Sequence, residues 1–118
     1  MKNKLNILLL DCNRDRLKRM ESLIRCCNEG KYCIDPRPSI GQDDYENNNY
    51  DIVFAHKGNK EVEDNDMMVW NSREAVIVYF SGGMNQDSLE YKGKWYVSAS
   101  FILKPENICK LLKDIIKI

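Results

Sequence analysis

Hydrophobic residues along this chain gather in short, nearly continuous runs that are separated by polar segments. Residues 5–10, 51–55 and 75–80 form the three strongest runs. Such runs are apolar on both faces, which is typical of central strands in a parallel sheet. Two other segments, 13–27 and 105–116, carry apolar residues three or four positions apart and are predicted to be amphipathic helices. Strands that alternate with helices predict an α/β fold with helices on both faces of the sheet.

Weaker signals complete the predicted sheet. Residues 32–34 form a short strand candidate, and Pro36 and Pro38 are expected to bar further pairing there. Residues 90–97 have the pattern of a hairpin, or of a turn that leads into a strand. The apolar run at 101–103 is predicted to be one more strand.

Length, composition and charge set the broad class. The 118 residues fit a single domain, 1–118, and 43% of them are hydrophobic and 31% charged. Lys+Arg and Asp+Glu both number 18, so no overall positive field would attract nucleic acid or an acidic membrane surface. The first apolar run is too short to span a bilayer, and Asp11 interrupts it before a signal peptide could be completed. We therefore expect a cytoplasmic protein.

The five cysteines also favour a cytoplasmic protein. Their odd number, an adjacent pair and the lack of a C-x-x-C spacing argue against a disulfide framework and against a structural zinc site. Zinc would also need more imidazole support than the single histidine offers. Free thiols in a reducing cytoplasm, with no metal and no cofactor, are the expectation.

The order of elements resembles a response-regulator receiver domain over essentially the whole chain. The residues that carry the resemblance are Ile7–Asp11, Tyr50–Phe54, Ala75–Ser81 and Phe101–Pro105. The resemblance implies a single doubly wound, mainly parallel five-stranded sheet of the flavodoxin-like type. Its third and fourth helical regions are expected to be shortened, because 56–81 leaves little room for a full crossover helix and the fourth helical region falls on the predicted hairpin.

The resemblance also implies where chemistry would lie. Active receivers use two acids to hold Mg²⁺, an aspartate as phosphoacceptor, a hydroxyl and a lysine. Asp11, Ser81 and Lys104 fall where one acid, the hydroxyl and the lysine belong, and Lys104 is equally suited to an ion pair with Asp11. His56 stands at the acceptor position. The second acid position holds Leu10 or Cys12, depending on the register.

These departures predict a degenerate receiver, or pseudo-receiver, that lacks the phosphoacceptor aspartate. With one carboxylate instead of three, Mg²⁺ binding should be weak. His56 is open to three interpretations: a structural residue, part of a binding site, or a phosphorylated or catalytic histidine. The candidate degenerate pocket at the carboxyl ends of the strands consists of Asp11, His56, Ser81, Gly82 and Lys104.

The functional hypothesis is a non-catalytic signalling or adaptor domain that acts through protein–protein contact. The chain ends soon after its last helix, so we expect no effector domain and an output through a protein partner in trans. A homodimer is possible, whereas nucleic-acid and membrane partners are not expected. The alternative is a regulatory domain that binds a small molecule or phosphate in the degenerate pocket, where Ser81-Gly82-Gly83 could cradle an anion. A flavin-binding redox protein is a third reading, but the charged, glycine-free loop at 11–16 disfavours it.

Overall fold

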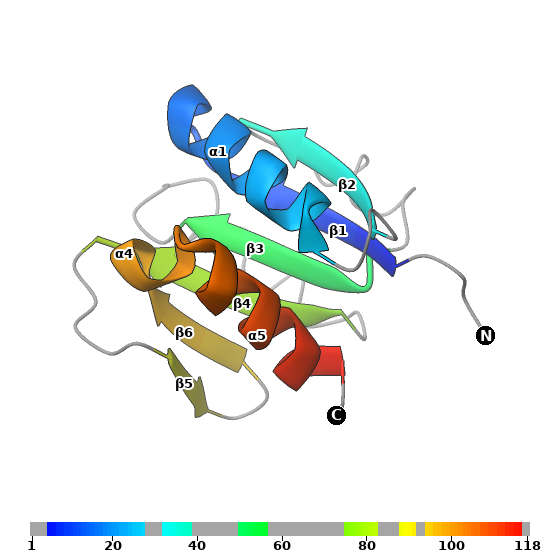
Figure 1. The fold of residues 1–118 in the computed structure, drawn as a ribbon, viewed down its shortest axis with the longest axis vertical. Helices are drawn as coiled ribbons and strands as arrows, with labels where there is room; N and C mark the ends of the chain where they lie inside the picture. Colours follow the sequence, from blue (N-terminus) through cyan, green and yellow to red (C-terminus); the bar gives the residue numbers. More distant parts are fainter. Residues whose placement is uncertain are drawn as a thin grey trace.

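The computed structural model describes residues 5–27, 32–38, 50–56, 75–82, 88–91 and 94–116. Figure 1 shows one sheet with helices packed against it. In chain order the elements are β1 (Leu5–Leu10), α1 (Arg14–Arg25), β2 (Tyr32–Arg37), β3 (Ile52–His56), β4 (Val76–Ser81), β5 (Ser88–Tyr91), β6 (Lys94–Ser98), α4 (Ala99–Ile102) and α5 (Pro105–Ile116).

The sheet has the strand order β2-β1-β3-β4-β6-β5. Five strands, β2, β1, β3, β4 and β6, run parallel to one another, and β5 pairs antiparallel with β6 at one edge. The predicted five-stranded parallel sheet of the flavodoxin-like type is therefore confirmed. The β5–β6 pair also confirms the hairpin that was predicted in place of a fourth helical region.

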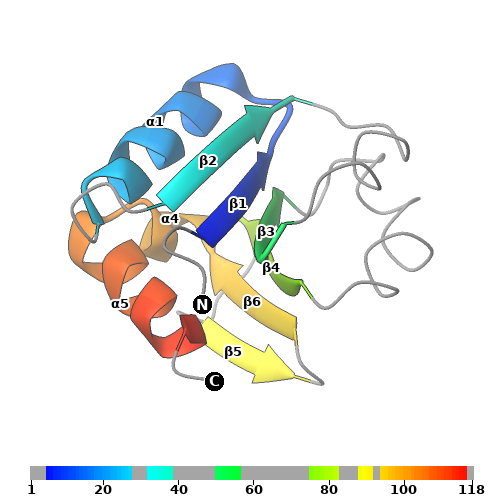
Figure 2. The same cartoon turned by 90° about the vertical axis from the view of Figure 1, so that its right-hand side faces the viewer.

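The central strands are buried on both faces, as their apolar runs predicted. Along β1, Ile7 and Leu9 belong to one core cluster while Leu8 and Leu10 belong to a second, and all four are at most 1% exposed. The strands β3 and β4 divide their side chains in the same way. Figure 2 shows α1, α4 and α5 together on one face of the sheet, which is the face of the larger cluster. No described helix covers the opposite face.

The two long helices follow the predicted apolar stripes. Asn13 caps α1, because its side-chain oxygen accepts the backbone N–H of Arg16 at 3.0 Å. The side chains that α1 and α5 bury against the sheet are Leu17, Met20, Ile24, Ile108, Leu111, Leu112 and Ile115. Among the described residues, no helix is long and apolar enough to cross a membrane.

The predicted end of the second strand was wrong, because β2 continues through Pro36 to Arg37. The carbonyl of Arg37 accepts the backbone N–H of Asp11 at 3.2 Å. Because neighbouring residues of a strand direct their backbone groups to opposite sides, the backbone nitrogen of Pro36 faces away from β1. That direction is the edge of the sheet as described, since β1 is the one described strand that pairs with β2. A proline lacks an N–H donor, and on an edge strand the missing donor breaks no ladder hydrogen bond.

The strand predicted at 101–103 was also wrong. These residues fall in and just after the short helix α4, and β6 is the fifth parallel strand. Ala99 and Ile102 lie three positions apart and are both buried, so this short apolar run fits a helical turn. Periodicity alone cannot separate a strand from a helix over so few residues.

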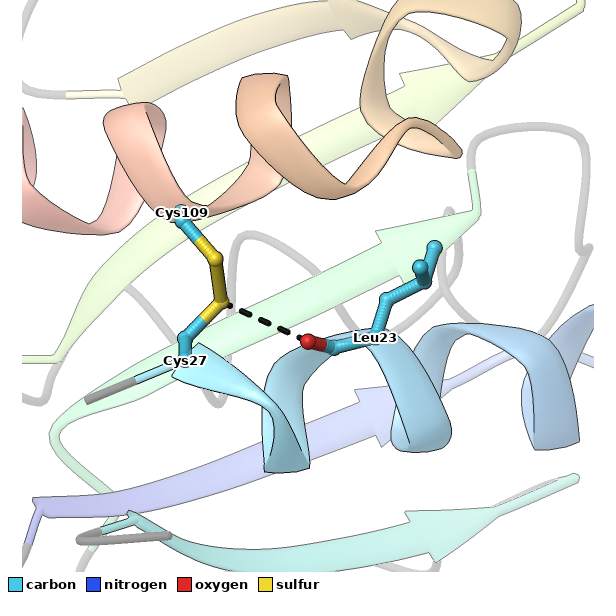
Figure 3. Close-up of a disulfide and its surroundings, with 3 residues drawn as sticks. All are labelled: Leu23, Cys27 and Cys109. Atoms are coloured by element: carbon cyan, nitrogen blue, oxygen red, sulfur yellow. Dashed lines mark hydrogen bonds between the residues drawn. A yellow bond between two sulfur atoms is a disulfide. The ribbon is translucent and has the colours of Figure 1, made fainter. Parts of the chain in front are cut away.

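The expectation of free thiols was wrong for two of the five cysteines. Cys27 and Cys109 form a disulfide with a Cα–Cα distance of 5.5 Å, and the bridge joins the end of α1 to α5 (Figure 3). Cys12, Cys26 and Cys33 are free and exposed. The segments 39–49 and 57–74, which include the region where a shortened third helix was predicted, lie outside the described residues.

Candidate functional site

The carboxyl ends of the parallel strands bring polar side chains to one edge of the sheet. Asp11 directly follows β1, His56 ends β3, Ser81 ends β4 and Ser98 ends β6. The register of β1 with β3, carried one residue further, sets Asp11 beside His56. Ser81 and Ser98 are direct partners in the β4–β6 ladder. Four of the five residues of the predicted pocket, Asp11, His56, Ser81 and Gly82, therefore end a strand or directly follow one at this edge.

Asp11 is fully buried, and its carboxylate is held by the chain itself. Its Oδ1 accepts the Arg16 Nη2 donor at 2.9 Å and the backbone N–H of Asn13 at 2.9 Å. Its Oδ2 accepts a short hydrogen bond from Arg16 Nε. The guanidinium thus binds both oxygens, which is the strongest common geometry for a carboxylate–arginine pair. This pairing excludes the predicted ion pair between Asp11 and Lys104.

Arg16 is the site residue that sequence reasoning missed. It is one of several basic residues of α1, and the Asn13 cap, which starts the helix at Arg14, turns this third helical residue back toward the strand end. Only 24% of its side chain is exposed. The hydrogen bonds to Asp11 raise the pKa of Arg16, and burial opposes that rise only in part. Arg16 therefore stays charged and serves as the counter-ion of Asp11.

His56 is a neutral, partly buried ring at this edge. Its imidazole meets the ring of Phe80 edge-on, with a centroid distance of 5.3 Å and an interplanar angle of 68°. Burial lowers the pKa of His56, and the positive charge of Arg16 lowers it further, while Asp11 acts in the opposite direction. Within the described part of the chain, the buried Nδ1 has no hydrogen-bond partner. Because an orphan N–H would be costly, Nδ1 is best assigned as the bare lone pair of the neutral ring.

A titration of His56 tests this electrostatic arrangement. The chain has one histidine, so its ring proton signals can be followed by NMR without assignment of others. We expect a midpoint below the ordinary value of 6.5. Arg16→Met removes the repelling charge and leaves Asp11 without its counter-ion, so the midpoint should rise. Arg25→Met, which breaks an exposed pair with Glu21, should leave it unchanged. An unchanged midpoint in Arg16→Met would contradict the arrangement.

The same pKa shift fixes the sign of a pH effect on stability. Below the unfolded-state value of 6.5, the unfolded chain binds more protons at His56 than the folded chain does. The free energy of unfolding should therefore decrease as the pH falls from about 7.5 to about 5.5, and His56→Gln should flatten that slope. Urea denaturation across this range measures both slopes.

The hydroxyl groups along the edge belong to β4, β6 and the start of α4. Ser98 is 7% exposed, and its Oγ lies 2.8 Å from the Oγ of Ser100. Gly82 follows β4 in an exposed turn, and a Cβ built there would meet no atom within 4 Å. Crowding therefore does not require glycine at position 82. Gly83 lies outside the described residues, so the predicted anion cradle of Ser81-Gly82-Gly83 stays a hypothesis.

Lys104 does not end a strand. It lies in the exposed turn between α4 and α5, where its backbone carbonyl accepts the N–H groups of Asn107 and Ile108 at 3.1 and 3.0 Å. In the described part of the chain its ammonium group forms no hydrogen bond or ion pair. Lys104 directly precedes α5, and Arg16 is the cation that contacts Asp11.

The donor set at this edge does not fit Mg²⁺. Magnesium prefers several oxygen ligands in near-octahedral geometry. Both Asp11 oxygens are bound by Arg16, and the described residues contain no cluster of three histidine, cysteine, aspartate or glutamate side chains that could hold a metal ion. The guanidinium supplies the positive charge that a metal would otherwise bring to this carboxylate.

Comparison with known proteins places the fold. No family model and no curated relative matches the sequence. Among solved structures, a response regulator from Thermotoga maritima superposes with a TM-score of 0.70 at 11% identity and covers 98% of this chain and 99% of its own. The chain has the receiver fold. HP1043, an orphan response regulator of H. pylori, superposes with a TM-score of 0.58 at 17% identity over 99% of this chain and 98% of its own.

Within the receiver fold, the predicted acid, the histidine and the hydroxyl lie along one edge of the sheet. The resemblance placed a phosphoacceptor where this chain has His56, and His56 ends the strand next to β1. The predicted lysine does not end a strand, and Arg16, which the resemblance did not name, binds the carboxylate of Asp11. The edge offers hydrogen-bonding groups and the Asp11–Arg16 ion pair, in which both carboxylate oxygens are bound. At the end of β3 it offers a histidine and no carboxylate nucleophile.

Proposed function

We propose that this protein is a non-catalytic signalling domain of receiver fold that acts through contact with a protein partner in trans, without aspartyl phosphorylation. The Asp11–Arg16 pair is the observation that carries the proposal. Aspartyl phosphorylation needs a carboxylate nucleophile and a cation that offsets charge on the transferring phosphoryl group. The retained acid already has both oxygens bound by arginine, and a neutral histidine stands at the neighbouring strand end.

The signalling role and the location are part of this proposal. The two similar structures are response regulators, which supports a role in signal transduction. A cytoplasmic site, a protein partner and possible homodimerisation fit such a role. We propose no enzymatic activity, because the edge presents no activated nucleophile among its described residues.

Charge counts against the alternative of a phosphate-binding domain. The hydroxyls of Ser81, Ser98 and Ser100 suit hydrogen bonding to an anion, but the positive charge of Arg16 is offset by Asp11, and the pKa of His56 is lowered. An anion at this edge would meet no uncompensated positive charge among these groups. Thermal-shift measurements with phosphate and nucleotides on the wild type and on His56→Ala would detect such binding.

Incubation with acetyl phosphate and Mg²⁺ tests the main proposal. We expect no hydroxylamine-sensitive phosphoryl group on the intact protein by mass spectrometry, because the described residues at this edge offer neither a free carboxylate nucleophile nor a metal site. An active receiver domain treated in parallel controls for the reagent. His56→Asp restores a carboxylate but leaves Arg16 on Asp11, so it too should stay unmodified. An acyl phosphate on the wild type would overturn the proposal.

A further inference from the structure

The disulfide between Cys27 and Cys109 has no part in the function proposed above. Cys27 lies just beyond the C-cap of α1 and Cys109 lies in α5, 82 residues further along the chain. Figure 3 shows the two helices side by side with the bridge between them. The closed loop contains every described strand except β1. The bridge therefore fixes the first helix to the last one across the face of the sheet.

The two sulfur atoms differ in their surroundings. Cys27 is 3% exposed, whereas Cys109 is only partly buried. A thiolate that attacks the bridge has better access to the Sγ of Cys109, and attack there makes Cys27 the leaving group.

The structure provides a place for the Cys27 thiol after reduction. Its Sγ lies 3.4 Å from the carbonyl oxygen of Leu23, the approach drawn as a dashed line in Figure 3. A disulfide sulfur carries no hydrogen, so in the oxidised protein this approach is only a contact. A thiol would donate to the same carbonyl, which is among the last four of α1 and lacks a regular helical partner there. Reduction would thus replace the covalent bond between Cys27 and α5 with a hydrogen bond from Cys27 to the last turn of α1.

The other contacts between the helices do not depend on the bridge. Arg19 Nη2 donates to the Leu103 carbonyl at 3.3 Å, just before α5. The apolar stripes of α1 and α5 belong to one core cluster. Loss of the covalent link therefore leaves the helices packed on the sheet, with less constraint on their relative position.

We propose that Cys27–Cys109 is a reversible thiol–disulfide exchange site that locks α1 to α5, with a dithiol as its reductant. One thiolate of the dithiol bonds to Cys109 Sγ, the Cys27–Cys109 bond breaks, and Cys27 leaves as a thiolate that takes up a proton. The second thiolate of the dithiol then displaces Cys109 and closes the dithiol's own disulfide. The protein gains two electrons and two protons, and the dithiol loses them. Disulfides in reducing compartments are usually transient or sensing ones, which suits the cytoplasmic site proposed above.

Thiol counting and hydrogen exchange test this proposal, with dithiothreitol as the dithiol. The untreated native protein should alkylate at the three free cysteines, and the reduced protein at all five. On reduction, amides in α5 and in the last turns of α1 should exchange about tenfold faster while β1 and β3 keep their protection. Oxidised dithiothreitol or oxidised glutathione should restore the first state.

Adjacent cysteines give a matched pair of variants. Cys26→Ser removes a free, exposed thiol and should respond to dithiothreitol as the wild type does. Cys27→Ser removes the bridge and should resemble the reduced wild type in either condition, as should Cys109→Ala. Five alkylated cysteines in the untreated protein would overturn the proposal. Equal exchange in both states would also overturn it, as would loss of protection in every strand on reduction.

Discussion

Reduction of the Cys27–Cys109 disulfide should lower the free energy of unfolding by about 4.5 kcal/mol near room temperature, from the chain-entropy relation for a loop of this size. The relevant length is the separation of 82 residues between the two cysteines. A cross-link over so long a loop removes many conformations from the unfolded chain, so most of the effect arises in the unfolded state. Single domains are stable by only about 5–15 kcal/mol, so this change is a large fraction of the total.

Urea denaturation with and without reductant measures this effect. The oxidised protein should also show the smaller m-value, because a cross-linked unfolded chain exposes less surface. Cys33→Ser is the matched control, since Cys33 is a free, exposed cysteine on β2 and its loss should leave the response to reductant unchanged. Equal free energies of unfolding in water for the oxidised and reduced wild type would show that the bridge adds no stability.

The stability that this bridge contributes bears on the proposed thiol–disulfide exchange site. A reduced domain that still unfolds cooperatively would have lost the lock and kept its core. Cys27 belongs to the larger core cluster and Cys109 packs against it, whereas the smaller cluster, formed by side chains of β1, β3 and β4, contains neither cysteine. After reduction the two helices would still be held on the sheet by apolar burial, by the Asp11–Arg16 pair and by the hydrogen bond from Arg19 to Leu103.

Much of the fold could be predicted because burial on both faces leaves a clear pattern. In the runs at 5–10, 51–55 and 75–80, successive apolar side chains belong alternately to the two core clusters. The structure confirms all three strands within one residue at each end. The run at 101–103 failed for a physical reason. Three apolar residues fill one helical turn as well as a short strand, and only the neighbouring β6 decides which is formed.

The site was harder to predict because no motif in the sequence marks the residues that contact one another there. In the sequence Arg16 is one of several basic residues of the first helix, and the Asn13 cap turns it toward Asp11. The disulfide left no spacing signal, since its cysteines are separated by nearly the whole fold. An acid at a strand end, a capping residue two positions later and an arginine three positions after that would together have indicated the ion pair.

Removal of Arg16 should destabilise the domain by about 3 kcal/mol or more, because breaking one partner from a buried ion pair leaves an uncompensated charge. In Arg16→Met the fully buried Asp11 carboxylate would keep only the Asn13 N–H as a donor. Methionine preserves most of the apolar length of the side chain, so lost packing contributes little. Arg25→Met is the control, since its partner Glu21 and Arg25 itself lie toward solvent, and its cost should be within about 0.5 kcal/mol.

A double-mutant cycle separates the pair from the burial of its members. Asp11→Asn keeps an oxygen for the Asn13 N–H and removes the charge, so it should cost less than Arg16→Met. With Asp11 neutral, Arg16→Met has no buried charge to expose, and the coupling between the two sites should be roughly 1–3 kcal/mol. Urea denaturation of the four proteins measures it. Additive effects would mean that Arg16 is a solvated neighbour of Asp11. In that case the retained acid would be open to other cations, and the argument against metal-dependent phosphorylation would lose its main support.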